Sequence, residues 1–289
     1  MEIFLQIIVN GILTASLYAL VAGGLSFLYA TTKIFHLAHG VVTLGAGYTF
    51  WWLWISLGWH PLAAVLGALV MAVLVGLLTN ELVYEILRRK GTKGLGYLIA
   101  ALALLILGTG FILALFGGAP KTFQFQTQTF AFGDVHLTVL QLWTIVIALL
   151  LLGAFFYLSK YTKLGKAMRA TADNEIVAQI LGVNTRNIRR LAFILSSILA
   201  AAAGILLGLE FNLDPNMGVL LTLKGFAAAV IGGVGSLGGA ILGSLIIGVG
   251  EQFVVWFLTA GWRNAVTFIL LFIFLLFKPT GLLGERREL

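Results

Sequence analysis

A glutamate and a glutamine stand inside an otherwise apolar stretch of this chain. Glu251 and Gln252 lie within the run 240–258, which holds no other charged residue. An ionisable group among apolar residues in lipid faces the interior of a helix bundle or a water-filled cavity. We therefore expect both side chains to line a polar path or to brace a broken helix. A carboxylate at the outer end of its segment is the alternative.

Two histidines, His36 and His39, are three residues apart in the polar stretch 30–40. Zinc needs further ligands within reach, but none is near in sequence and the chain has no cysteine. We expect these rings to pack or to line a path, without a metal. An intramembrane hydrolase would also need a second carboxylate, a serine with a base, or a metal set. We therefore do not expect an enzyme.

The composition places the chain in a membrane. Apolar residues make up 60% of it and charged residues 10%, against about 25% charged residues in soluble domains. The net charge of +7 comes from Lys and Arg at the ends of apolar runs. Nucleic-acid binding uses basic patches with stacking aromatic residues, so no nucleic acid is expected. No phosphate loop of the type G-x-x-x-x-G-K-[ST] occurs, and we expect the chain itself to bind no cofactor.

The apolar runs predict an all-α polytopic membrane protein with eight or nine transmembrane segments, built as one domain over residues 1–289. A span needs about 20 apolar residues, and the sequence leaves open whether the short segment 220–232 crosses or re-enters. Residues 117–138 form an external loop, in which Gly133 and Asp134 are typical of a two-residue hairpin turn. The expected segments are 3–29, 41–57, 61–90, 97–116, 139–158, 191–209, 220–232, 240–258 and 264–277.

Two polar or glycine-rich stretches, 33–40 and 232–239, interrupt the apolar pattern at comparable places in the two halves. Paired breaks indicate discontinuous helices whose free backbone groups line a path near the membrane midplane. Close packing of small residues between helices is the alternative for the second break. The residues expected at the path are Asn10, His36, His39, Gly40, Gly232, Gly233, Gly235, Ser236, Glu251 and Gln252.

The central stretch 157–190 carries seven Lys/Arg and has no apolar run long enough to cross a bilayer. Thr162 can cap a short helix that runs through residue 172. Asp173 can cap a second helix, which ends at Gly182 in the left-handed conformation. A third helix starts at Asn184 or Thr185 and continues into the next apolar segment.

The second short helix is amphipathic, with Ile176, Val177, Ile180 and Leu181 on one face. Such a face can dock in a groove of a soluble partner, or it can lie on the inner lipid headgroups beside its basic neighbours. At the inner end of the third segment, Glu85 and Arg89 are spaced for an i,i+4 ion pair on one helix.

The positive charges favour one orientation of the chain. With the N-terminus outside and nine crossings, only Lys121, Lys224 and Arg263 lie outside, and the other Lys and Arg, including Arg286 and Arg287, lie inside. The positive-inside rule therefore places 157–190 and the C-terminus in the cytoplasm. Glu210, Asp214 and Lys224 fall at the outer mouth, where they either dock an external partner or are solvated loop charges.

A series of short motifs is spread along nearly the whole chain. They are Asn10-Gly11, Tyr18-Ala19-Leu20, Gly23-Gly24, Ala38-His39-Gly40, Lys163-Leu164-Gly165, Leu181-Gly182-Val183-Asn184-Thr185, Lys224-Gly225-Phe226, Gly232 to Ser236, Glu251 and Pro279-Thr280-Gly281. In this order the chain resembles the permeases of branched-chain amino acid ABC importers, the LivH-like member of the pair more than the LivM-like one. It departs from them at Ile34-Phe35-His36, where the family usually has a small polar residue. It also has Ala170-Thr171-Ala172 in place of the Glu-Ala-Ala of importer coupling loops.

The resemblance implies a type II-like ABC importer permease in the plasma (inner) membrane of a bacterium or archaeon. Its partners would be a second homologous permease, two cytoplasmic ATPase subunits that use ATP, an external substrate-binding protein and membrane lipid. The solutes would be branched-chain or related hydrophobic amino acids, and an ion-coupled secondary transporter of a small zwitterion is the alternative. The residues that couple to the ATPases would be Arg169, Asp173, Glu175, Ile176, Val177, Ile180, Leu181 and Gly182.

Overall fold

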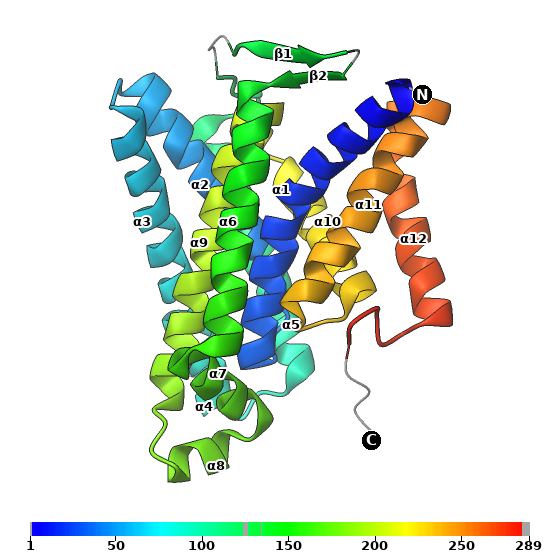
Figure 1. The fold of residues 1–289 in the computed structure, drawn as a ribbon. Coiled ribbons are helices and arrows are strands. Elements are labelled where there is room, and N and C mark those ends of the chain that lie inside the picture. The colour runs from blue at the N-terminus through cyan, green and yellow to red at the C-terminus, as the bar shows by residue number, and fades with distance from the viewer. Residues whose placement is uncertain (1, 124–126, 134, 285–289) are drawn as a thin grey trace.

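The computed structural model describes residues 2–123, 127–133 and 135–284. The described chain is a helical bundle with one small hairpin at its N-terminal end (Figure 1). Arg286 and Arg287, which the charge argument counts as cytoplasmic, lie outside the described residues, as does Asp134 of the expected hairpin turn. In chain order the elements are α1 (Glu2–Thr32), α2 (His39–Trp51), the π-helical turn η1 (Trp52–Ser56), α3 (Pro61–Thr79), the π-helical turn η2 (Asn80–Tyr84), α4 (Glu85–Arg89), α5 (Gly94–Phe116), β1 (Thr129–Phe132), β2 (Val135–Thr138), α6 (Val139–Tyr161), α7 (Lys163–Asp173), α8 (Glu175–Ile180), α9 (Thr185–Phe211), α10 (Met217–Gly232), α11 (Leu237–Phe257), the 3-10 turn η3 (Ala260–Trp262) and α12 (Arg263–Phe277).

Seven helices among the described residues are long and apolar enough to cross a membrane. They are α1, the continuous helix of α3, η2 and α4, and then α5, α6, α9, α11 and α12 with its preceding 3-10 turn. Two further apolar helices, α2 with 13 residues before its continuation as the π-helical turn η1 and α10 with 16, are shorter than the roughly 20 residues of a full crossing. Each of the two adjoins one of the expected breaks.

The helix ends follow local chemistry. Pro61 opens α3 at its first turn, where a missing N–H costs nothing. Thr138 and Gln141 form a reciprocal capping box at the start of α6. Ser236 accepts a hydrogen bond from the Gly239 amide and restarts the chain as α11. Polar residues thus divide long apolar runs into separate helices.

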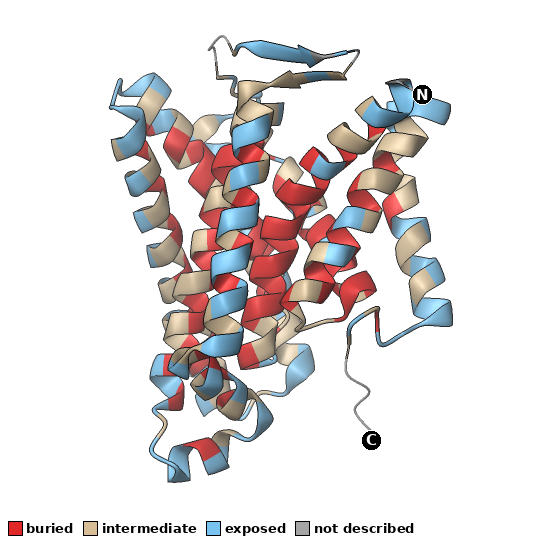
Figure 2. Cartoon of the chain, in the orientation of Figure 1, coloured by how far each residue is buried: buried red, intermediate tan, exposed pale blue. Residues whose placement is uncertain are grey.

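The core forms around α1 and α9. Helix α1 packs against α6, α9, α10 and α11, whereas α9 packs against α2 and α3 as well. Leu17 and Leu20 of α1, Leu199 of α9 and Ile247 of α11 are fully buried in one hydrophobic cluster. Figure 2 shows buried residues along these inner helices and exposed ones along the outward faces of α3, α6 and α12. The exposed outward side chains are mostly large and apolar, as a lipid-facing surface requires.

The hairpin confirms the strands expected in the external loop. Strands β1 and β2 pair antiparallel, with Phe132 opposite Val135, and Gly133 has a positive φ of 63°. The Gln6 side chain of α1 bonds the backbone N–H and C=O of His136 in β2. The hairpin therefore lies at the N-terminal end of α1 (Figure 1).

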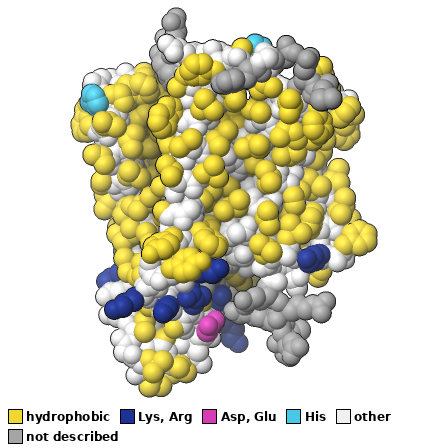
Figure 3. All heavy atoms as spheres, viewed as in Figure 1, with side chains coloured by type: hydrophobic (Ala, Val, Ile, Leu, Met, Phe, Trp, Pro, Cys, Tyr) yellow, Lys and Arg dark blue, Asp and Glu magenta, His cyan; other side chains and the backbone are white. Residues whose placement is uncertain are grey.

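The opposite end of the bundle holds α7, α8 and the last described residues (Figure 1). Figure 3 shows the Lys and Arg side chains gathered there, next to a broad apolar face. A belt of apolar side chains bounded by basic residues on one side is the pattern of a helical membrane protein.

Candidate functional site

The two short helices α7 and α8 form a surface that projects from the basic end of the bundle (Figure 1). As the sequence predicts, the Thr162 hydroxyl accepts from the Gly165 amide and caps α7. Asp173, however, is not the cap of the next helix, because α7 continues through it. Asn174 takes that role: its backbone is extended and its side chain accepts from the amides of Ile176 and Val177.

Helix α8 ends in a left-handed turn, as expected. Gly182 has a φ of 84°, and its N–H donates to the Gln179 carbonyl while the Val183 N–H donates to the Ala178 carbonyl. This pair of bonds is the Schellman motif, which satisfies the last carbonyls of a helix. A six-residue helix is thereby closed at both ends by its own sequence.

The apolar side of α8 faces away from the bundle. Ile176, Val177, Ile180 and Leu181 are 71%, 49%, 79% and 75% exposed, whereas Ala178 on the opposite side is buried. Four adjacent exposed aliphatic residues, which we call the α8 apolar face, make a compact hydrophobic patch beyond the bundle. A patch of this kind marks a contact with a partner or with lipid.

Ion pairs tie α8 to two spans. Glu175 bonds Arg88 of α4 at 3.1 Å and also pairs with Arg189 of α9. Arg189 Nε lies 2.7 Å from Glu85 Oε1, and both side chains are buried. We call Glu85, Arg88, Glu175 and Arg189 the loop network. It connects the short helix to the ends of two long ones.

The expected i,i+4 pair between Glu85 and Arg89 is wrong. Glu85 points to α9 and Arg189, because that carboxylate is buried between the two helices, while Arg89 is exposed. Sequence reasoning missed this contact since its partners are 104 positions apart. The sequence did hold a signal for such contacts, because Glu81 and Glu85 stand one helical turn apart in the third span and need basic partners. In the structure Glu81 likewise pairs with Arg186 and Arg190.

The loop network holds Glu175 ionised. Burial would raise the pKa of this carboxyl, but the guanidinium groups of Arg189 and Arg88 and the Thr185 hydroxyl outweigh it, so the pKa lies below its ordinary value of 4.5. Of the other expected coupling residues, Arg169 is exposed and donates to the Ser159 carbonyl of α6. Asp173 is exposed at the end of α7.

The first expected break is present between α1 and α2. Residues 33–38 are not helical, and Lys33 has a φ of 57°. His36 and His39 are both buried, with ring centroids 6.3 Å apart. His36 Nδ1 lies 2.8 Å from the Tyr84 hydroxyl, and His39 Nδ1 lies 3.4 Å from the Ser196 hydroxyl. The described residues contain no group of three potential metal ligands.

The second break, between α10 and α11, is also present. Gly233 and Gly235 have φ values of 109° and 88°, which only glycine adopts readily. Gly232 at the end of α10 touches Gly239, where a side chain on either would collide with the other's carbonyl. The amides of Leu282 and Leu283 donate to the Ile231 and Gly232 carbonyls, so the C-terminal segment caps α10.

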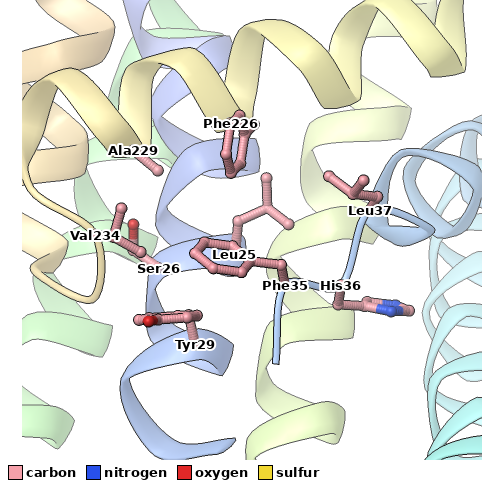
Figure 4. Close-up of a pocket in the computed structure, with 9 residues that line it drawn as sticks. All are labelled: Leu25, Ser26, Tyr29, Phe35, His36, Leu37, Phe226, Ala229 and Val234. Carbon is pink, nitrogen blue, oxygen red and sulfur yellow. The ribbon is translucent and has the colours of Figure 1, made fainter. Parts of the chain in front are cut away.

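The two breaks meet at one small pocket (Figure 4). Tyr29 of α1, Phe35 and His36 of the first break, Phe226 of α10 and Val234 of the second break all line it. In Figure 4 the His36 ring points away from the others, and its Nδ1 contacts the Tyr84 hydroxyl instead. Gly40 and His39 contact other parts of the bundle: Gly40 packs against Gly218 and Thr222 of α10.

Other expected path residues lie elsewhere. Asn10 and Gln252 line a cavity of about 560 Å³ between the N-terminal part of α1 and the C-terminal part of α11, together with Gln6 and His136. The Gln252 amide also donates to the Thr14 hydroxyl at 3.0 Å. The structure therefore divides the expected set between the pocket at the two breaks and a separate cavity near the start of α1.

Glu251 faces the bundle interior, as expected, but its partner was not foreseen. Glu251 Oε1 lies 2.7 Å from Lys224 Nζ, and both side chains are buried. The Tyr18 hydroxyl donates to Glu251 at 2.9 Å and accepts from Lys224 at 3.0 Å, and the Thr267 hydroxyl donates to Glu251 at 2.5 Å. We call Tyr18, Lys224, Glu251 and Thr267 the membrane cluster.

The placement of Lys224 at the outer mouth is wrong. Helix α10 begins at Met217 inside the bundle, so Lys224 lies two turns into it and is only 4% exposed. Of the other residues expected at that end, Glu210 accepts from the Gln141 amide, and Asp214 accepts from the Asn216 amide. Both are partly exposed.

Comparisons with known proteins agree with this architecture. The model of the family described as branched-chain amino acid transport system / permease component matches residues 7–275. The chain is 31% identical to the high-affinity branched-chain amino acid transport system permease protein LivH of Escherichia coli K12, over 98% of this chain and 96% of the relative. It is 32% identical to the corresponding permease protein BraD of Pseudomonas aeruginosa, with the same coverage. A solved structure, PsaBC from Streptococcus pneumoniae in complex with Fab, shares the fold with a TM-score of 0.51 at 17% identity, covering 96% of this chain and 92% of that one.

Proposed function

Because this chain belongs to the family of permease components of branched-chain amino acid transport systems, we propose that it forms half of the membrane pathway of an ATP-driven importer. Its solutes are branched-chain or related hydrophobic amino acids. The chain catalyses no reaction and binds no cofactor of its own, and ATP is used by partner subunits. The observation that carries the coupling part of this proposal is the α8 apolar face.

The α8 apolar face supports docking of a cytoplasmic ATPase. Its aliphatic side chains are spaced along a helix as the anchors of a helix-in-groove contact. A helix lying on headgroups would bury its apolar side in the membrane, but this helix lies beyond the ends of the spans (Figure 1). The loop network then passes a displacement of α8 to α4 and α9, because Glu175 bonds both.

The proposed assembly holds a second homologous permease, two ATPases and an external substrate-binding protein. The basic end with α7 and α8 is cytoplasmic, so the N-terminus and the hairpin are outside. The chain then crosses nine times, with α2 and α10 as the two short crossings beside the breaks. Glu210 and Asp214 lie near the outer end of α9 and are candidates for contact with the binding protein.

The breaks support a pathway that passes beside the adjoining ends of α1, α2, α10 and α11. Non-helical backbone in the hydrocarbon region is tolerated where protein covers it or water reaches it, and both breaks of this chain meet at one pocket. We place the pathway beside residues 33–40 and 232–239. The membrane cluster braces α10 against α1 and α11 and does not line the path.

The test is transport by the assembled complex in liposomes. Leucine uptake against its gradient is expected when ATP is on the side of the membrane that holds the ATPases and the binding protein is on the opposite side. It is not expected from a sodium or proton gradient without ATP. Uphill uptake by this chain alone on an ion gradient would contradict the proposal and support a secondary transporter.

A further inference from the structure

The pocket between the two breaks contains a buried hydroxyl without a partner. Ser26 is fully buried, and its Oγ makes no hydrogen bond to any described residue. Other hydroxyls of α1 do find partners: Ser16 bonds the Ile12 carbonyl and Thr32 bonds the Leu28 carbonyl, each four residues earlier. Buried polar groups are nearly always paired. An unpaired hydroxyl on a pocket wall therefore marks a place for a ligand group.

The remaining wall is apolar and aromatic (Figure 4). The Phe35 ring lies between two others, with centroids 4.4 Å from Tyr29 and 5.6 Å from Phe226. Leu25 and Val234 complete the lining beside Ser26. An apolar wall with one or two polar groups is the usual composition of a small-molecule site.

The pocket is closed in this conformation. Its free volume is about 10 Å³, which is enough for a single water at most. Phe35 sits on the non-helical backbone of the first break. Phe226 is fixed on α10, which the Lys224–Glu251 pair and the C-terminal segment both hold. Of the two rings, Phe35 is therefore the one free to swing aside.

We propose that this pocket is a closed solute site of the pathway. It takes the aliphatic side chain of an amino acid between the rings of Phe35 and Phe226, and the Ser26 hydroxyl bonds one of the polar groups of that amino acid. The Phe35 ring is the movable wall. This inference rests on the proposed function, which supplies the amino acid as ligand.

The chain contains no cysteine, so a single thiol can report on the pocket. In the complete transporter, Ser26→Cys is labelled with a small methanethiosulfonate reagent, and the modified chain is separated before detection. A closed site that opens in a minor population reacts slowly, and removing the wall with Phe35→Ala should raise the rate about tenfold or more. Leucine at a concentration that saturates uptake should slow the reaction several-fold, and glutamate should not.

The matched control is Ser244→Cys, because Ser244 is equally buried but bonds the Ala240 carbonyl away from the pocket. It should stay unreactive in every condition. If Ser26→Cys does not assemble, Val234→Cys across the pocket carries the same expectations.

If the Ser26 thiol variant were labelled equally fast with and without the Phe35 ring, or if leucine did not slow the labelling, the proposal of a solute site would be wrong. In that outcome ATP-driven leucine uptake by the unmodified complex would still stand. Loss of ATP-driven uptake in the unmodified complex would instead overturn the proposed function.

Discussion

Two groups of paired charges in this protein share their chemistry but differ in their surroundings. In the membrane cluster the Lys224 and Glu251 side chains are 4% and 0% exposed. In the loop network the Arg88 and Glu175 side chains, which form the pair at α8, are 27% and 33% exposed, whereas the Glu85–Arg189 pair behind them is buried. A buried charge that loses its partner is strongly destabilising, whereas exposed pairs contribute little to stability. The difference indicates a brace in the membrane cluster and a movable connection at the Arg88–Glu175 pair, through which α8 contacts α4.

The geometry agrees with this distinction. The membrane cluster joins helices α1, α10, α11 and α12, with the hydroxyls of Tyr18 and Thr267 completing the shell of Glu251. Arg263 at the start of α12 also approaches Glu251, at 4.0 Å. The loop network joins α8 to α4 and α9 at the surface of the bundle. One is enclosed by spans and the other lies beside the proposed docking face.

The largest effect on stability is expected from Glu251→Ala. It leaves Lys224 buried and unpaired, which costs about 3–5 kcal/mol, so the yield and thermal stability of detergent-purified permease should fall sharply. The double variant Lys224→Met/Glu251→Leu should recover most of that stability, because no uncompensated charge remains. Size-exclusion profiles on heating measure both. If Glu251→Ala were as stable as the wild-type chain, the membrane cluster would not be a structural brace.

A smaller effect on folding but a clear effect on coupling is expected from Glu175→Gln. Glu175 itself is partly exposed, and its buried partner Arg189 keeps its ion pair with Glu85, so the free energy of unfolding should change by about 1 kcal/mol or less. Leucine uptake per ATP hydrolysed should fall several-fold, since α8 loses its charged bonds to α4 and α9. Lys166→Gln, an exposed change on α7, is the control. An unchanged uptake-to-hydrolysis ratio would show that the loop network does not transmit motion.

The smallest expected effect is the pH dependence of the stability that Glu175 contributes. The folded-state pKa of Glu175 is below its ordinary value of 4.5, so its stabilising contribution is fully present above that pH and is lost as pH falls through the folded pKa. The stability difference between wild type and Glu175→Gln should therefore be constant near neutral pH and shrink below about 4.5. Thermal unfolding of both chains across that range measures it. A difference that grows on acidification would contradict the assignment.

Local patterns in the sequence predicted much of this fold. The apolar runs, the cap at Thr162, the helix start at Asn184 or Thr185 and the stop at Gly182 are all local signals, and the structure has them. The start of α8 was misplaced by one residue because Asp173 and Asn174 are both good capping residues. Only the backbone, extended at Asn174, distinguishes them.

The pairings between distant residues could not be predicted in the same way. Lys224 and Glu251 belong to different helices, and Glu85 and Arg189 are 104 positions apart. No local period encodes which faces of two helices meet. For the same reason the sequence grouped Asn10 and His36 in one pathway, although they line separate cavities.

The central claim is that an ATPase acts on the bundle through the α8 apolar face, and Ile180→Asp tests it most directly. Ile180 is 79% exposed, so the change should leave the permease folded while it places a charge at the centre of the contact. Asn187→Asp adds the same charge to the exposed first turn of α9, outside that face, and serves as the control. In liposomes that hold the complete transporter, Ile180→Asp should reduce leucine uptake per ATP hydrolysed about tenfold or more, as loss of an interface anchor does, and Asn187→Asp should not. Full uptake by Ile180→Asp, with normal co-purification of the ATPase, would contradict the account.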